Sequence, residues 1–180
     1  NEVAALCAQG IDRVMAAKEL TLDEITTMAY AIPQKIDLFG FGHLPMSFSR
    51  RPLVRNYLEE IGLDSKFAEG MGLRIKEVKR NVYFPILEDD KATVIFADTV
   101  FCVLNELKAL ACNGVHAIIV DDLFVDPKLL PAYIRSCKNI LNGDNPRNEL
   151  ENLREIAPEL DFASGYFYQK TNLTKEGASL

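Results

Sequence analysis

The sequence predicts an α/β fold in which short parallel strands alternate with helices, interrupted by a small antiparallel insertion around residues 71–97. Short apolar segments alternate with segments whose apolar residues recur at helical spacing, an order typical of parallel β/α units. In the middle of the chain, two β-rich segments flank a polar turn at 88–91, which predicts a hairpin. A chain of 180 residues can build one sizeable core, so we expect a single domain over residues 1–180.

Capping and stop signals place the elements of the first half. Thr21 and Glu24 have the spacing of a capping box, which begins a helix. Pro33 ends that helix, because the residue before a proline avoids the α region. The expected elements are a helix over 2–9 ended by Gly10, a strand over 12–17, the capped helix from Leu22, a strand over 36–41, a loop that contains Pro45, and a helix over 53–61 ended by Gly62.

The second half has equally clear signals. Asp98 has the position of a cap for a helix over 99–113, and Asp126-Pro127 and Asn145-Pro146 place a cap directly before a first-turn proline. The expected elements are strand-like segments at 73–78, 82–87 and 92–97, the helix over 99–113, a buried strand over 116–120, a helix ended by Gly143, and a last short helix.

Composition narrows the class of protein. No run of eighteen apolar residues and no signal peptide are present, so we expect no membrane span and a cytoplasmic location. The four cysteines form no C-x-x-C pair, and we expect them to be reduced thiols in apolar surroundings. The net charge of −6 argues against binding nucleic acid without regard to sequence, although a local basic patch stays open.

Polar residues at the ends of the expected strands are the candidate site. Ligands of parallel α/β folds lie beyond the carboxyl ends of the strands. Those ends carry Lys18 and Glu19, then Gly42 and His43, then Asp121 and Asp122. His43 is either a general acid or base or a satisfied turn residue. Glu19 either serves the site or pairs with Lys18, and the two aspartates either bind a metal or activate water, or form a turn that leads into a helix.

A polar loop with two adjacent arginines follows the second strand. Arg50 and Arg51 suit carboxylate or phosphate groups, because a guanidinium binds such groups through two parallel hydrogen bonds. The alternative is a solvated loop that leads into the next helix. The sequence holds no G-x-S-x-G, H-E-x-x-H, P-loop or G-x-G-x-x-G motif, so these chemistries have no motif to support them.

Residues 36–51, which read IDLFGFGHLPMSFSRR, resemble the signature segment of the collagenase-like peptidases, a family of unassigned catalytic type numbered thirty-two among the peptidases. Residues 13–25, 83–89 with 93–96, and 113–121 resemble other segments of that family. The resemblance implies a partial (β/α) barrel-like fold. It also implies that this chain is the C-terminal part of a larger barrel protein and lacks its N-terminal strands, since a full barrel needs about 250 residues.

The chain departs from the family at cysteine positions. Many relatives have cysteines where this chain has Pro45 and Pro52, and such relatives are similar to iron–sulfur proteins that hydroxylate RNA bases or quinone precursors. We therefore expect no iron–sulfur cluster on this chain, and other cofactors are left open. Relatives also often have an arginine after the late strand, where this chain reads Asp121-Asp122-Leu123.

The resemblance implies peptide hydrolysis by an activated water, with a peptide or protein as substrate. In that mechanism His43 is the acid or base, Asp121 or Glu19 positions the water, and Arg50, Arg51, Lys18 and Asp122 bind substrate. The alternatives are an enzyme of RNA-base hydroxylation, or a partner subunit without cofactor for a cluster-bearing paralogue. Because a partial barrel leaves strand edges unpaired, we also expect self-association, which light scattering would detect.

Overall fold

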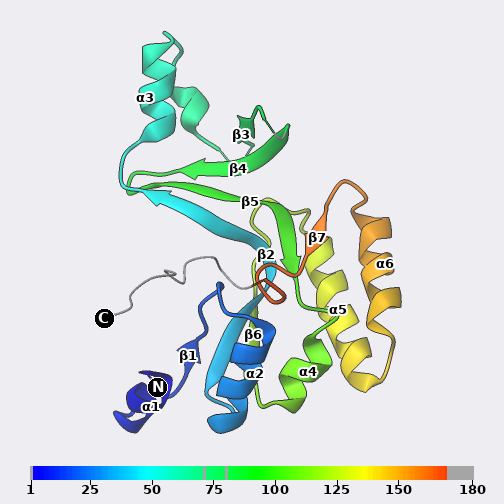
Figure 1. Cartoon of the computed structure of the whole chain (residues 1–180). Helices are drawn as coiled ribbons and strands as arrows, with labels where there is room; N and C mark the ends of the chain where they lie inside the picture. The colour runs from blue at the N-terminus through cyan, green and yellow to red at the C-terminus, as the bar shows by residue number, and fades with distance from the viewer. Residues whose placement is uncertain (1, 71, 80, 170–180) are drawn as a thin grey trace.

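Two long strands, β2 (Ile36–Ser49) and β5 (Thr93–Cys102), run between the two parts of the fold (Figure 1). The computed structural model describes residues 2–70, 72–79 and 81–169, and these residues form a seven-stranded mixed sheet. The first half of β2 pairs in parallel with β1 (Val14–Met15) and β6 (Ala117–Val120). Its second half pairs antiparallel with β5 (Thr93–Cys102). One strand therefore belongs to both a parallel and an antiparallel part.

The antiparallel part forms an arm, which we define as residues 45–70, 72–79 and 81–96. It contains α3 (Leu53–Glu60), the 3₁₀ helix η1 (Ser65–Ala68), β3 (Arg74–Glu77) and β4 (Val82–Glu88). Strand β4 pairs antiparallel with both β5 and β3. Figure 1 shows the arm projecting away from the helices that cover the rest of the sheet.

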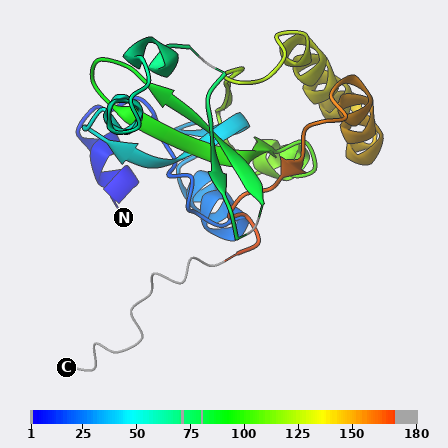
Figure 2. The same ribbon diagram turned by 90° about the horizontal axis from the view of Figure 1, so that it is seen from above.

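Helices cover the two faces of the remaining sheet. One core contains Ile25 and Ala29 of α2 (Leu22–Ala31) and Leu110 of α4 (Leu107–Cys112). The other contains residues of α5 (Leu129–Asn142) and α6 (Pro146–Ile156). Strand β5 serves both, because successive side chains of a strand point to opposite faces. The helix pair α5–α6 and the N-terminal helix α1 (Glu2–Ala8) lie on opposite sides of the molecule in both views (Figures 1 and 2).

Several local predictions are confirmed. The Thr21 hydroxyl accepts a hydrogen bond from the Glu24 amide and the Glu24 carboxylate accepts one from the Thr21 amide, which completes the capping box of α2. Helix α5 ends at Gly143, whose φ of 123° favours glycine. The Asn145 side chain accepts from the Arg147 amide and begins α6, with Pro146 in its first turn.

Several predicted boundaries are wrong, including the start of α5, where Lys128 and not Asp126 has the N-cap position. The strand predicted over 36–41 continues to Ser49, and Pro45 lies within it instead of in a loop. The pairing of β2 with β5 shifts register on both sides of Pro45, which accommodates a residue that cannot donate to the sheet. The helix predicted over 99–113 begins only at Leu107, because residues 99–102 extend β5 and pair with β2. Asp98 is therefore a strand residue and caps no helix.

The expected parallel, barrel-like sheet is only partly observed. Parallel pairing joins β1 to β2, β2 to β6, and β5 to β7 (Phe162–Ala163), whereas the other pairs are antiparallel. Antiparallel pairing also extends beyond the expected insertion at 71–97, into β2 and the second half of β5. The path of the sheet ends at β1 and at β3, so the described residues form an open sheet. Among the described residues, no helix has the length and apolar character that crossing a membrane requires.

Candidate functional site

A cavity of about 1430 Å³ lies where β5, the start of α6 and the C-terminal turn meet. Lys18 and Glu19, which follow β1, line it together with Leu44–Met46 of β2. The turn at 164–169 closes another side, and its Phe167 is buried against Phe101 at a ring-centroid separation of 5.2 Å. Strand ends and the start of a helix therefore surround one hollow.

Lys18 and Glu19 are the two predicted site residues that line this cavity. The Lys18 ammonium donates a hydrogen bond to the Pro45 carbonyl oxygen and lies 3.9 Å from the Glu19 carboxylate. The hydrogen bond to Pro45 holds the turn after β1 against β2. The alternative reading of Glu19, a partner for Lys18, is thus observed, while both side chains also face the hollow.

His43 lies elsewhere and is buried. It is a residue of β2 with 5% of its surface exposed, and it does not line the cavity, so the prediction of a loop histidine is wrong. Its Nδ1 donates to the Ala97 carbonyl oxygen over 2.7 Å, and its Nε2 has no partner among the described residues. Burial lowers the pKa of His43, which favours the neutral ring.

Asp121 and Asp122 form a turn behind β2. The Asp121 carboxylate accepts a hydrogen bond from the Leu123 amide over 2.9 Å, and Asp122 is exposed. A β-carbon on Gly42 would lie 2.7 Å from the Asp121 carbonyl oxygen, so this turn packs directly on β2. No group of three or more potential metal ligands occurs within the described ranges. The turn reading of these aspartates fits this geometry.

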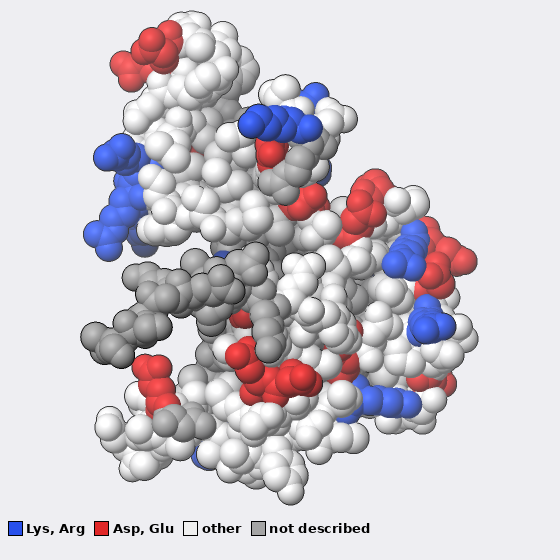
Figure 3. Space-filling view, in the orientation of Figure 1, with Lys and Arg blue, Asp and Glu red and all other residues white. Residues whose placement is uncertain are grey.

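Arg50 and Arg51 are exposed where β2 ends, at the far end of the arm. Both polar groups of the Arg51 backbone are hydrogen-bonded. The amide donates to the Ser49 hydroxyl, and the carbonyl oxygen accepts from the Thr93 hydroxyl. Neither guanidinium has an ion-pair partner in the part of the chain that the structure describes. Figure 3 shows lysine and arginine side chains gathered on this edge of the arm.

The seven predicted site residues therefore occupy three places. Lys18 and Glu19 line the cavity, His43 and the two aspartates lie by the turn behind β2, and the arginines mark the end of the arm. The structure does not bring His43 next to Glu19, whereas Asp121, the alternative to Glu19, lies against Gly42, the neighbour of His43 in β2.

The sequence analysis missed the buried carboxylate of the cavity. Glu106 is 4% exposed, and one of its oxygens accepts a hydrogen bond from the Tyr168 hydroxyl over 2.8 Å. Its other oxygen, Oε2, has no partner among the described residues. Burial raises the pKa of Glu106, and the hydrogen bond to that carboxylate raises the pKa of Tyr168 to about 12. The available signal was a glutamate between Leu104 and Leu107, in a stretch where only Asn105 and Lys108 are also polar.

The cysteines do not fit an iron–sulfur cluster. Cys7, Cys102, Cys112 and Cys137 are free and form no ligand group in the described ranges. Burial raises the pKa of Cys102 to about 12, which keeps it a thiol, whereas cluster ligands are thiolates. Pro45 and Pro52, where the resemblance led us to expect cysteines in relatives, lie in β2 and directly before α3 and have no ligating side-chain atom.

The sequence profile of peptidase family U32 matches residues 1–177. This chain belongs to peptidase family U32. The U32 chain is also 28% identical over 179 residues to tRNA hydroxylation protein P2 of Bacillus subtilis (strain 168), a match that covers 91% of this chain and 57% of that relative. The U32 chain thus spans little more than half the length of this relative. No solved structure matches it.

Proposed function

We propose that the U32 chain is part of a cytoplasmic protein that acts in the hydroxylation of transfer RNA, and that its arm contacts the RNA. The proposal combines the name of the 28% identical relative with one structural observation. That observation is the exposed pair Arg50–Arg51 at the end of the arm, with both guanidinium groups free of ion pairs in the described part.

The arginine pair suits a phosphate backbone. An arginine offers a planar set of donors that matches the oxygens of a phosphate, and it keeps its charge at every physiological pH. The hydrogen bonds from the Arg51 backbone to the side chains of Ser49 and Thr93 hold the backbone that carries the two arginine side chains. The acidic balance of the whole chain does not oppose this role, since RNA contact requires positive potential only at the surface that meets it.

Exposed aromatic rings lie on the same arm. Phe48 in β2 and Tyr57 in α3 are 67% and 63% exposed, so both rings are accessible to a ligand. Aromatic rings next to arginines are typical of surfaces that bind unpaired nucleotides, because bases stack on the rings while cations hold the backbone. The arm therefore supports contact with an unpaired loop of the RNA.

The oxidation step of the proposed reaction requires groups outside the described residues. The described cysteines do not fit a cluster, so we propose that an oxidising cofactor comes from a cluster-bearing paralogue or from another part of a longer protein. Additional strands from that longer protein would complete the barrel-like sheet that is open here.

Peptide hydrolysis is the second candidate, and the match to a peptidase family favours it. The cavity has room for a peptide segment, with Lys18 and Glu19 at its wall. The burial of His43 away from that wall weighs against the proposed acid or base.

A modified-nucleoside mass profile tests the two candidates. Transfer RNA from a strain without the full-length gene is expected to lose one hydroxylated base, and re-expression is expected to restore it. A profile identical to that of the parent strain would overturn the proposal. A peptide-library cleavage assay on the full-length protein would then test the second candidate.

A further inference from the structure

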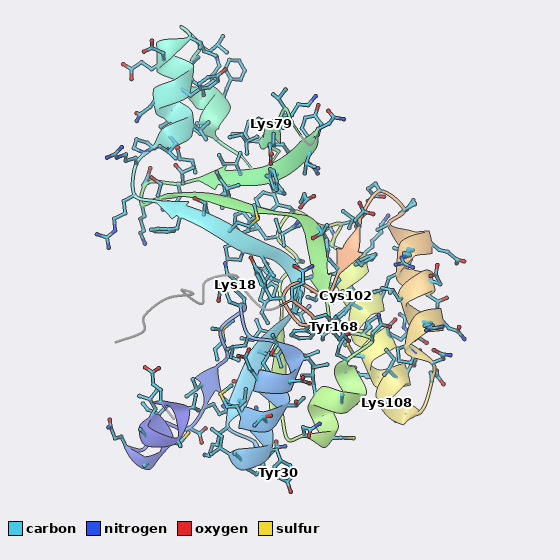
Figure 4. The ribbon with its side chains drawn as sticks, in the orientation of Figure 1. Lys18, Tyr30, Lys79, Cys102, Lys108 and Tyr168 are labelled. Atoms are coloured by element: carbon cyan, nitrogen blue, oxygen red, sulfur yellow. The ribbon has the colours of Figure 1, made fainter. Side chains whose placement is uncertain are left out.

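We propose that the cavity binds one nucleobase, and that the Glu106 carboxylate accepts hydrogen bonds from the N–H groups on the edge of that base. This proposal rests on the proposed function, since it names the part of the RNA that enters the molecule. Figure 4 shows Tyr168 close to Cys102, where the C-terminal turn passes the end of β5.

The first step concerns the unpaired oxygen of Glu106. Buried polar atoms almost always have a hydrogen-bond partner, so an orphaned buried oxygen at a cavity wall needs an explanation. Glu106 Oε2 has no partner among the described residues, although the side chain lines a cavity of about 1430 Å³. No arginine or lysine is among the groups that shift the pKa of Glu106. A ligand with N–H donors would satisfy this oxygen.

The second step concerns the tyrosines that stand beside it. Tyr166 and Tyr168 both line the cavity, and Tyr168 is 68% exposed although its hydroxyl reaches Glu106. An exposed ring tied by one hydrogen bond can exchange that bond for one from a ligand. The freed ring can then pack against a flat ligand, as aromatic side chains do against bases.

The third step concerns charge at the opposite wall. Helix α6 contributes Arg147 and Arg154 to the cavity, two helical turns apart and therefore on one face. Arg154 is paired with Glu151, whereas the Arg147 side chain has no partner within the described ranges. Lys18 and three further carboxylates, Glu19, Asp98 and Glu151, also line the cavity, so its charge is mixed. Lys18 is paired with Glu19, which leaves Arg147 as the cation that suits a phosphate attached to the base.

A guanidinium from a peptide is the competing ligand for Glu106. It also carries adjacent N–H donors and packs on aromatic rings. Arg147 offers the phosphate of a nucleotide a partner that a guanidinium cannot use, and this contact is the reason to choose the base. The competition is the basis of the test.

Saturation-transfer difference NMR on the full chain, with the four nucleoside 5′-monophosphates and with arginine methyl ester, tests the proposal. At least one nucleotide is expected to receive saturation on its base protons. Glu106→Leu, which replaces the carboxylate with an apolar group of similar size, is expected to weaken that binding about tenfold. Tyr168→Ala, an exposed position that the fold tolerates, is expected to weaken it as well. Glu155→Leu on the exposed face of α6 and Tyr30→Ala on α2 are the matched controls.

Three outcomes would overturn the proposal: no saturation transfer to any nucleotide up to about 5 mM, a limit far above common affinities; unchanged nucleotide binding in both variants; or displacement of the nucleotide by arginine methyl ester. Transfer RNA binding is measured on the same samples. If nucleotide binding is absent while RNA binding is intact, only the proposal that the cavity binds a base is refuted. Nucleotide binding without RNA binding would refute the proposed function and leave a site for free nucleotides.

Discussion

The Tyr133 hydroxyl in α5 donates a hydrogen bond to the Gly40 carbonyl oxygen in β2 over 2.9 Å. The Tyr133 ring also packs on Phe41, with 4.3 Å between ring centroids. This pair of contacts attaches the outer helix layer to the central strand, in a place where Tyr133 is fully buried.

Replacing Tyr133 by phenylalanine tests this attachment. The ring stays, the hydroxyl is lost, and the Gly40 oxygen keeps its bond from the Val103 amide. Because no acceptor is left unpaired, we expect the free energy of unfolding to fall by only about 1 kcal/mol, measured by urea denaturation. Tyr30→Phe, at an exposed position, is the control and should change nothing. A loss as large as that of a core cavity would show that the hydroxyl has another role.

Glu88 provides the second prediction, because its buried carboxylate begins α3 from a neighbouring strand. It accepts hydrogen bonds from the amides of Val54 and Arg55 and from the Thr93 hydroxyl, at 2.7, 3.1 and 2.6 Å. Glu88→Ala leaves the two amides without an acceptor, while the Thr93 hydroxyl can still donate to the Arg51 carbonyl oxygen. We expect the free energy of unfolding to fall by about 2–3 kcal/mol, with faster amide exchange confined to the arm. Glu60→Ala on the exposed face of α3 should leave exchange unchanged, and equal exchange in both variants would contradict this account.

The third prediction concerns acid stability through His43. Its folded pKa is lowered by burial below the ordinary value of 6.5, so the fold favours the neutral ring. The unfolded chain therefore takes up a proton that the fold resists. The stabilising contribution is present above 6.5 and is lost as the pH falls from 6.5 toward the folded pKa.

His43→Asn keeps a donor for the Ala97 carbonyl oxygen and removes the titration. We expect the urea midpoint of the wild type to fall more than that of the variant between about pH 7.5 and about pH 5.5. The raised pKa of Glu106 acts in the opposite direction, since its contribution is lost as the pH rises. It is common to both proteins and cancels in the comparison. Parallel pH profiles would show that His43 is protonated in the fold.

The fourth prediction concerns the arginines of the arm. If Arg50 and Arg51 each neutralise one phosphate, replacing both by alanine reduces the steepness of the salt dependence of transfer RNA affinity by about 1.5. Filter binding at several salt concentrations measures this slope. Lys108→Ala with Lys138→Ala, two exposed cations on α4 and α5, is the matched control and should keep the slope of the wild type. A variant with the wild-type slope would remove the arm from the RNA interface.

Local signals predicted the elements that local interactions determine. The capping box of α2 and the caps of α6 depend on residues within one turn, and the hairpin turn at 88–91 depends on Asp89, whose carboxylate accepts from the Lys91 and Ala92 amides. The predicted boundaries of β2 and β5 were wrong for another reason. Pro45 lies in β2 and the residues after Asp98 lie in β5, and these two strands are extended because they pair with each other.

The same reasoning explains the candidate site. Lys18 and Glu19 were found because a strand end is visible in the sequence. Glu106 and Tyr168 are 62 positions apart and meet because β7 pairs with β5, which no local pattern indicates. His43 was misplaced for the reason that applies to Pro45, since a strand interrupted by glycine and proline reads as one that has ended.

The sharing of β2 between the two parts has a consequence for mechanics. A pull on the end of the arm travels along one continuous backbone into the parallel part, past the carbonyl groups of Gly40 and Phe41 that fasten Tyr133 and the Asp121 turn. A flexible linker would absorb such a force, whereas a paired strand transmits it. A force on the arm is therefore transmitted to the parallel part, and it acts at the register shift between Phe39 and Phe41.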